Sequence, residues 1–423
     1  MILNISETEL SKCNGWSYEN IYFFVMMIYL GMANGYTQVL CYPPSMGLWT
    51  FFIPVILTIK LVTNNIQCFS NLFSLKKILF IISIWIILQS LKFNKIEPMN
   101  LFLLYNVVMA FIICRVYGMR AFFMFEKCIV ILAALSLPIW FLYNIIPFII
   151  DYFFSIIGIE SDGTLLWSGF FCNIASSSDF LGVRNVGFAQ EPGHWASFLI
   201  LGIFINLLIH DFNYRNKSFI ILLLALITSQ STTGYSAFFF IVVTIILMSA
   251  RHRLFLVIVS ALIIPSIIAL PFMREKMEKY AYSEDSIDMI RYNGDYIEKE
   301  GGEAVFVPQR FEGFVLEALN FINDPIIGYG VKETNSYVAK TISPYVSCSN
   351  GNVKVFSRYG VILGFLFFIM LYRSGKELTV KHSKRISLSW IGIYVLLGMS
   401  YEFTTIPLLL SFWGMSYFKK NYY

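Results

Sequence analysis

Long apolar runs that end at polar or basic residues recur along most of the chain. A helix needs about 20 mostly apolar residues to cross the hydrocarbon core of a bilayer, and runs of this order predict about twelve membrane spans. Their approximate positions are residues 20–40, 46–63, 78–91, 99–116, 128–150, 192–209, 217–231, 234–250, 254–273, 354–372, 386–401 and 404–418. The pattern predicts an all-α, polytopic integral membrane protein.

Composition agrees with this prediction and excludes several other classes. Hydrophobic residues make up 57% of the chain and charged residues only 13%. A disordered chain, a collagen, a disulfide-stapled secreted domain and a soluble domain with one anchor are all excluded. The formal charge of +5 does not imply nucleic acid, because in a membrane chain the placement of Lys and Arg carries the information.

The seventh and eighth predicted spans could also be read as one long helix. Arg215 and Lys217 flank one side of this pair, and Arg251 and Arg253 flank the other. If basic flanks face the cytoplasm, both ends are cytoplasmic and the chain turns back between them. The polar turn available is Ser229–Gly234.

The distribution of basic residues also predicts the orientation. With the N-terminus in the cytoplasm, most Lys and Arg near the spans fall on the inner side, and the opposite short loops hold only Lys92, Lys95 and Arg184. Both termini are therefore expected in the cytoplasm. The first residues are polar and acidic without a basic segment, so the first span is expected to stay in the mature protein.

This orientation places two polar stretches outside, residues 151–191 and 274–353. The predicted domains are residues 1–273, with nine spans and the first outer loop, the large loop 274–353, and residues 354–423, with three spans. Within the large loop, Phe311–Ile322 has helical apolar spacing and should lie along the membrane surface or cover a cavity.

Two of the seven cysteines, Cys172 and Cys348, fall in the outer loops. An oxidising compartment would permit a disulfide between them, and two independent thiols are the simpler alternative. The four histidines are dispersed and there is no CxxC or HExxH motif, so a protein-bound catalytic metal is not expected.

The segment Arg184–Phe198 leads from an outer loop into the sixth span. Pro192 suits the first turn of a helix and places Glu191 at the helix entry. Its carboxylate could accept a proton or bind a hydroxyl there, or it could be an ordinary acidic N-terminal cap. His194, one turn inside, is more readily a packed interfacial residue than a base.

Three arginines, Arg184, Arg310 and Arg358, lie in the predicted outer loops or just inside a span, where a cation is scarce or costly. Guanidinium groups match phosphate oxygens, so each could bind a diphosphate near the low-dielectric boundary. Each could instead pair with an acid, such as Asp179 for Arg184. Arg358 lies about a turn inside the tenth span, where a functional partner is most expected.

Two polar turns leave the same choice between structure and binding. Ser231 and Thr232 belong to a hydroxyl cluster that suits sugar hydroxyls but equally satisfies backbone freed at a helix–helix turn. Gly328 and Gly330 follow Asp324 and Pro325 in a turn that allows tight backbone passage or the approach of a ligand.

Together these segments resemble the O-antigen polymerase family, which is related to the O-antigen ligases. The resemblance rests on the order of an Arg-x-x-Gly-x-x-x-Glu-Pro run at Arg184–Pro192, a Ser/Thr-Gly turn at Ser229–Gly234, an Arg followed by a DPxxGxG turn at Arg310–Gly330, and the segment Asn350–Phe368. It covers most of the chain in topology but only these segments in residues.

The resemblance implies a C-type glycosyltransferase in the inner membrane of a Gram-negative bacterium, with its active site facing the periplasm. The implied donor is a glycan on undecaprenyl diphosphate, and the implied acceptor is another lipid-linked repeat unit. No metal or cofactor is implied; the implied partners are these substrates, membrane lipid and a regulator of chain length. Ligase relatives carry an outer-loop His after the glycine turn, whereas this chain has Ser349 and Asn350 there, which favours polymerase over ligase.

On this hypothesis Arg184, Arg310 and Arg358 bind the diphosphate and Glu191 accepts the proton of the attacking hydroxyl, which gives an inverting transfer. The residues expected to contact substrate are His194, Ser231, Thr232, Gly328, Gly330 and Asn350. The competing hypothesis is a flippase or other transporter of lipid-linked oligosaccharide. No internal repeat of the kind common in transporters is evident, and the polar residues concentrate at the outer boundary.

Overall fold

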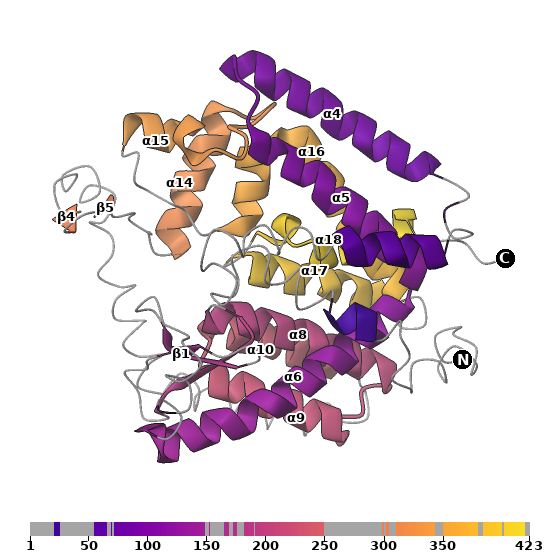
Figure 1. The fold of residues 1–423 in the computed structure, drawn as a ribbon, viewed down its shortest axis with the longest axis vertical. Coiled ribbons are helices and arrows are strands. Elements are labelled where there is room, and N and C mark those ends of the chain that lie inside the picture. The colour runs from indigo at the N-terminus through magenta and orange to yellow at the C-terminus, as the bar shows by residue number, and fades with distance from the viewer. Residues whose placement is uncertain are drawn as a thin grey trace. The chain divides into compact units, whose positions relative to one another are not determined.

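A computed structural model gives a mostly helical chain (Figure 1). The residues that it describes are 21–25, 55–65, 69, 72–148, 152, 165–168, 172–175, 182–189, 191–248, 298–299, 302–303, 310–342, 350–379, 384–399 and 402–418. They belong to two compact units, each assembled from separate stretches of sequence. Unit 1 comprises residues 1–66, 116–274 and 375–393, and unit 2 comprises 67–115, 275–374 and 394–423.

Within the described residues, five of the predicted spans are helices long and apolar enough to cross a membrane. They are α4 (Phe73–Phe93), α5 (Pro98–Tyr117), α6 (Arg120–Ile145), α8 (Pro192–Ile209) and α16 (Gly351–Leu378). Their existence agrees with a membrane protein. The count of twelve spans and the orientation stay predictions.

Four labelled helices within other predicted spans are apolar but shorter. They are α9 (Lys217–Ser229), α10 (Thr232–Met248), α17 (Lys384–Gly398) and α18 (Pro407–Phe418); Val55–Asn64 forms a further short helix. A helix of 13 residues such as α9 rises about 20 Å, less than the hydrocarbon core. The predicted span 254–273 and most of 20–40 lie outside the described residues.

Unit 1 is built around α8, which is buried almost all round. Its apolar residues occupy every side of the helix, the composition expected of a core helix rather than an amphipathic one. Gly202 lets α8 approach Ile129 of α6 and Leu222 of α9. Phe204 stacks on Trp390 of α17 with ring centroids 5.8 Å apart.

A small sheet departs from the all-α expectation. Strands β1 (Leu165–Ser168), β2 (Asn173–Ala175) and β3 (Arg184–Gly187) form a three-stranded antiparallel sheet within the predicted outer loop 151–191. Trp140 of α6 donates from Nε1 to the carbonyl of Val183 at 2.6 Å and so ties the sheet to that helix. The short β4 (Glu298–Lys299) and β5 (Gly302–Glu303) pair within the other loop.

Cys172 precedes β2 as a buried free thiol, and burial raises its pKa. Cys348 lies outside the described residues. The independent-thiol alternative therefore holds for Cys172, whose sulfur lies 3.7 Å from the carbonyl oxygen of Ser136.

In unit 2 the predicted helix over Phe311–Ile322 is present as α14 (Arg310–Asn323). Leu316 of α14 and Val338 of α15 (Tyr337–Thr341) form a buried contact that Leu319 and Ile342 enclose. Part of the apolar surface of the helix therefore packs within its own unit, while Phe314 and Ile322 are exposed. The described part of unit 2 also includes the single-turn 3₁₀ helices η5 (Glu333–Asn335) and η6 (Phe403–Thr405).

Candidate functional site

The candidate site of unit 2 begins with a break in α16. Gly360 has φ 75° and ψ 174°, which interrupts the helix one residue after Tyr359. Such a break leaves carbonyl oxygens before it and an N–H after it without their usual helical partners. Those groups must find partners elsewhere.

The turn Asp324–Gly330 supplies these partners. Tyr329 N donates to the carbonyl of Ser357 at 2.9 Å, and Gly330 N donates to that of Arg358 at 3.0 Å. In return Val361 N donates to the carbonyl of Pro325 at 2.8 Å. The predicted glycine turn therefore serves tight backbone passage: a Cβ on Gly328 would lie 2.4 Å from the carbonyl oxygen of Arg358.

Helix α4 holds the other side of this turn. Trp85 Nε1 and Gln89 Nε2 both donate to the carbonyl of Ile327 at 2.9 Å, and Gln89 Nε2 also donates to that of Gly328 at 2.8 Å. Lys92 donates to the same Gly328 carbonyl and forms an ion pair with Asp324. A polar stripe on an apolar span is thus used to fix a loop onto α16.

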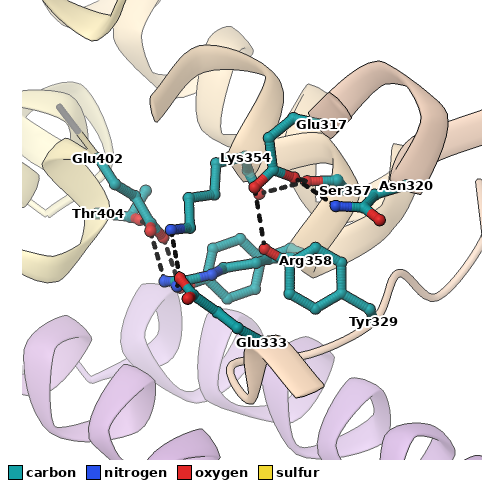
Figure 2. Close-up of polar contacts among 10 residues, drawn as sticks. Glu317, Asn320, Tyr329, Glu333, Lys354, Ser357, Arg358, Glu402 and Thr404 are labelled. Atoms are coloured by element: carbon teal, nitrogen blue, oxygen red, sulfur yellow. Dashed lines mark hydrogen bonds and ion pairs between the residues drawn. The ribbon is translucent and has the colours of Figure 1, made fainter. Parts of the chain in front are cut away.

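Arg358 lies beside this junction and its guanidinium is nearly buried (Figure 2). Its Nη1 donates to Glu402 Oε2 at 2.5 Å. Glu402 Oε1 accepts from the hydroxyls of Tyr359 at 3.1 Å and Thr404 at 2.9 Å. Glu402 is thus a fixed counter-ion, with both of its oxygens hydrogen-bonded.

A second carboxylate serves two cations. Glu333 Oε1 accepts from Lys354 Nζ at 2.6 Å and from Arg358 Nη2 at 3.1 Å (Figure 2). Lys354 and Arg358 are four residues apart on α16, so their side chains share one face. The side chain of Glu333 is 37% exposed, whereas those of Lys354 and Arg358 are each 10% exposed.

Glu317 of α14 forms the inner edge of the cluster. Its carboxylate accepts from Ser357 Oγ, from Tyr329 OH at 3.3 Å and from Asn320 Nδ2 at 3.3 Å. Burial raises the pKa of Glu317, against the opposing influence of Lys354, Ser357 and Arg358. Burial, and then the neighbouring Glu317, raise the pKa of Tyr329.

The arrangement has the properties of an anion-binding site in which a carboxylate of the protein, that of Glu333, takes the place of the ligand. Two cations project from adjoining turns of one helix, and their shared carboxylate is more exposed than the other ion-paired groups. Exchange of Glu333 for an anionic ligand would keep both cations paired, whereas Glu402 and Glu317 would remain as the fixed frame.

The other predicted arginine with a described side chain, Arg184, makes different contacts in unit 1. It lies on β3 and donates from Nε to the carbonyl of Ser229 at 3.3 Å and from Nη2 to that of Gln230 at 3.0 Å. These carbonyls stand at the C-terminal end of α9, where a cation complements the helix dipole. Arg184 therefore stabilises the turn between α9 and α10.

Glu191 occupies the position that the sequence predicted. It is the N-cap residue of α8 with extended backbone, Pro192 follows in the first turn, and its side chain makes no capping hydrogen bond. The residue is exposed, and His194 one turn later is half-buried. Glu191 therefore stands at the cap position without a hydrogen bond from its side chain to the helix start, and both alternatives for its carboxylate stay predictions.

Comparisons with protein-family models, with curated proteins and with solved structures found no match.

Several of the predicted substrate contacts have structural roles. Ser231 Oγ accepts from Gly234 N at 3.3 Å and caps α10, which Thr232 begins. Asn350 is buried and accepts from Val353 N at 3.3 Å, which caps α16. Gly328 and Gly330 have φ of 76° and 80°, as the turn requires.

Arg310 is the first residue of α14, and its side chain lies outside the described part of the structure. The sequence did not single out Lys354, Glu333, Glu402 or Glu317 as site residues. Lys354 carried a signal, since it stands one helical turn before Arg358; Glu402 lies 44 residues beyond Arg358, and its pairing needs the fold. Among the described residues there is no cluster of three His, Cys, Asp or Glu that could hold a metal ion.

Proposed function

We propose that this protein is a membrane-embedded glycosyltransferase that polymerises lipid-linked O-antigen repeat units. One observation carries the proposal from the structural side: Lys354 and Arg358, at the start of a membrane-length helix, share the partly exposed carboxylate of Glu333. The resemblance of the sequence to the O-antigen polymerases supplies the substrate class.

A diphosphate is the ligand that fits such a pair of cations. The planar guanidinium of Arg358 can present two N–H groups to phosphate oxygens, and the Lys354 ammonium adds a compact charge one turn away. A diphosphate that replaces Glu333 would bring more negative charge than the carboxylate it displaces. Its Coulomb attraction to the two cations is therefore stronger than that of Glu333, most of all where the surrounding dielectric is low.

In the proposed reaction an acceptor hydroxyl oxygen attacks the anomeric carbon of the donor glycan. The bond from that carbon to the diphosphate oxygen breaks, and undecaprenyl diphosphate leaves with the bonding electron pair. Lys354 and Arg358 stabilise the negative charge that develops on the leaving group. The hydroxyl proton passes to a carboxylate, a role that the sequence suggested for Glu191. The suggested contacts of Arg184 and Arg310 with the diphosphate stay predictions from the sequence.

The test is polymerisation by the purified full-length chain from a defined undecaprenyl-diphosphate-linked repeat unit. The informative variant is Lys354→Gln, because it leaves the Arg358–Glu402 pair and the backbone junction in place. The proposal predicts long glycan from the unaltered chain and a loss of at least about tenfold in rate for Lys354→Gln. The matched control is Lys376→Gln in the last turn of the same helix, which should leave the rate unchanged.

Failure of the unaltered chain to lengthen glycan under these conditions would sink the proposal. Movement of a single repeat unit across a vesicle membrane without lengthening would identify the flippase alternative instead. An equal loss of polymerisation rate in Lys354→Gln and Lys376→Gln would contradict the assignment of Lys354 and Arg358 as the diphosphate-binding cations.

A further inference from the structure

Four lysines gather where α4 ends, apart from the cluster around Arg358. Lys92 and Lys95 belong to the end of α4 and the turn after it, Lys332 precedes η5, and Lys340 lies in the last turn of α15. These four residues are called the lysine patch. Their segments are distant in sequence and come together within unit 2 (Figure 1).

Two lysines of the patch lie against the ring of Phe93. The ammonium of Lys92 lies 4.9 Å from the centroid of this ring, and that of Lys340 lies 5.3 Å from the same centroid. Two like charges on one ring repel each other, so the arrangement is stabilised by an anion placed between them.

The acids of the patch do not balance its charge. Asp324 pairs with Lys92, and one oxygen of Glu97 lies 3.4 Å from Lys95 Nζ and 4.0 Å from Lys332 Nζ. Lys340 has no carboxylate partner among the described residues. The patch therefore combines four cations with two carboxylates and carries an excess of positive charge.

Exposed apolar side chains adjoin these lysines. Leu91 is 73% exposed, Ile96 is 67% exposed, and Ile326, beside Asp324 in sequence, is 65% exposed. Helix α4 is itself a candidate span that ends at Phe93. With α4 across the bilayer, the patch would lie where hydrocarbon gives way to headgroups. Apolar and cationic groups thus meet at the depth at which a phospholipid presents both of its parts.

We propose that the lysine patch binds the phosphodiester headgroup of an anionic membrane phospholipid. The excess positive charge attracts the phosphate, and the exposed apolar residues contact the upper part of the acyl chains. A free phosphate ion would satisfy only the first of these interactions. This site uses none of the side chains proposed to bind the diphosphate and does not depend on the proposed reaction.

The test is native mass spectrometry of the full-length chain in a non-ionic detergent, titrated with phosphatidylglycerol and, separately, with phosphatidylcholine. The variant combines Lys95→Gln, Lys332→Gln and Lys340→Gln, and it spares Lys92 because that residue also holds the Gly328 carbonyl. We expect the unaltered chain to retain phosphatidylglycerol preferentially. The triple variant should bind it at least about tenfold more weakly, since each lysine near a lipid phosphate contributes on the order of 1 kcal/mol.

Two control variants keep the result specific. The triple Lys→Arg variant at the same positions should retain phosphatidylglycerol, because it conserves the charge. The combination of Lys60→Gln, Lys76→Gln and Lys77→Gln makes the same charge change at exposed positions elsewhere and should leave at least one preferred phosphatidylglycerol bound.

Three outcomes would overturn the proposal. Equal binding of phosphatidylcholine would remove the role of the headgroup charge. An equal loss in both Lys→Gln combinations would make the effect one of net charge rather than of this site. Displacement of phosphatidylglycerol by an equal concentration of inorganic phosphate would show that the ligand is a phosphate anion without lipid.

Discussion

Of the three arginines predicted to bind a diphosphate, the two with described side chains illustrate two ways to hold a cation in an apolar protein. In unit 1, Arg184 donates to two backbone carbonyls at the end of α9. In unit 2, Arg358 pairs with the carboxylates of Glu402 and Glu333. The sequence suggested the same diphosphate-binding role for both, but the partners that the fold gives them differ in charge.

This difference has energetic consequences. Carbonyl oxygens are dipoles, so loss of Arg184 leaves acceptors that water can satisfy at the partly buried edge. Carboxylates are full charges, so loss of Arg358 leaves the buried Glu402 without this counter-ion, at a much greater cost. The comparison predicts that substitutions at the unit 2 site lower the free energy of unfolding more than substitutions around Arg184 in unit 1.

The largest effect is expected at the backbone of the unit 2 site. Gly360 has a left-handed backbone conformation, and a Cβ on it would lie 2.0 Å from the carbonyl oxygen of Ile326. Gly360→Ala should lower the free energy of unfolding by at least about 4 kcal/mol through strain and overlap. Gly182→Ala in unit 1, at a similar φ but against the side chain of Asn144, should cost less; denaturant titration in mild detergent measures both.

The next largest effect concerns the buried ion pair. Arg358→Met should lower the free energy of unfolding by about 3–4 kcal/mol, because Glu402 loses its counter-ion. Adding Glu402→Gln should recover most of that loss, since the double variant carries no isolated buried charge. A double variant no more stable than Arg358→Met would contradict the view that uncompensated charge causes the loss.

A smaller effect is expected in unit 1. Arg184→Ala removes two hydrogen bonds and a favourable interaction with the α9 dipole, which together contribute about 1–2 kcal/mol to the free energy of unfolding. Arg184→Lys should retain part of it, because the charge stays near the carbonyls. A destabilisation equal to that of Arg358→Met in the same titration would erase the contrast between the two regions.

The smallest effect is the pH dependence that Glu317 contributes. Its pKa in the folded chain is raised above the ordinary 4.5, so the native state keeps a proton that the unfolded state releases. The contribution to stability is complete below about pH 4.5 and decreases as the pH rises toward the folded pKa. Unfolding midpoints measured from pH 4.5 upward should fall less steeply in Glu317→Gln than in the unaltered chain. An unchanged slope would reject the assignment of this pH dependence to Glu317.

Apolar runs were sufficient to predict where the main helices lie. The five membrane-length helices fall on predicted spans, and the turn at Gln230 and Ser231 separates α9 from α10 as the basic flanks suggested. The small sheet around Cys172 was missed, because its strands are only three or four residues long and carry no alternating pattern.

The site was less predictable than the helices. The cost of a charge in an apolar segment identified Arg358 without its partners. Its pairing with Glu402 and the docking of the glycine turn on α16 join positions far apart in sequence, and local patterns carry no such information. Of the two alternatives left open for Gly328 and Gly330, the structure shows tight backbone passage, and Asn350 and Ser231 cap helices.

The central claim, that Glu333 occupies the place of a diphosphate on Lys354 and Arg358, is tested most directly by equilibrium binding of a short-chain polyprenyl diphosphate to the purified chain. The account predicts that Glu333→Gln binds the diphosphate more tightly than the unaltered chain, because a competing carboxylate is gone, and that Lys354→Gln binds it more weakly. Unchanged or weaker binding by Glu333→Gln, together with unchanged binding by Lys354→Gln, would contradict it.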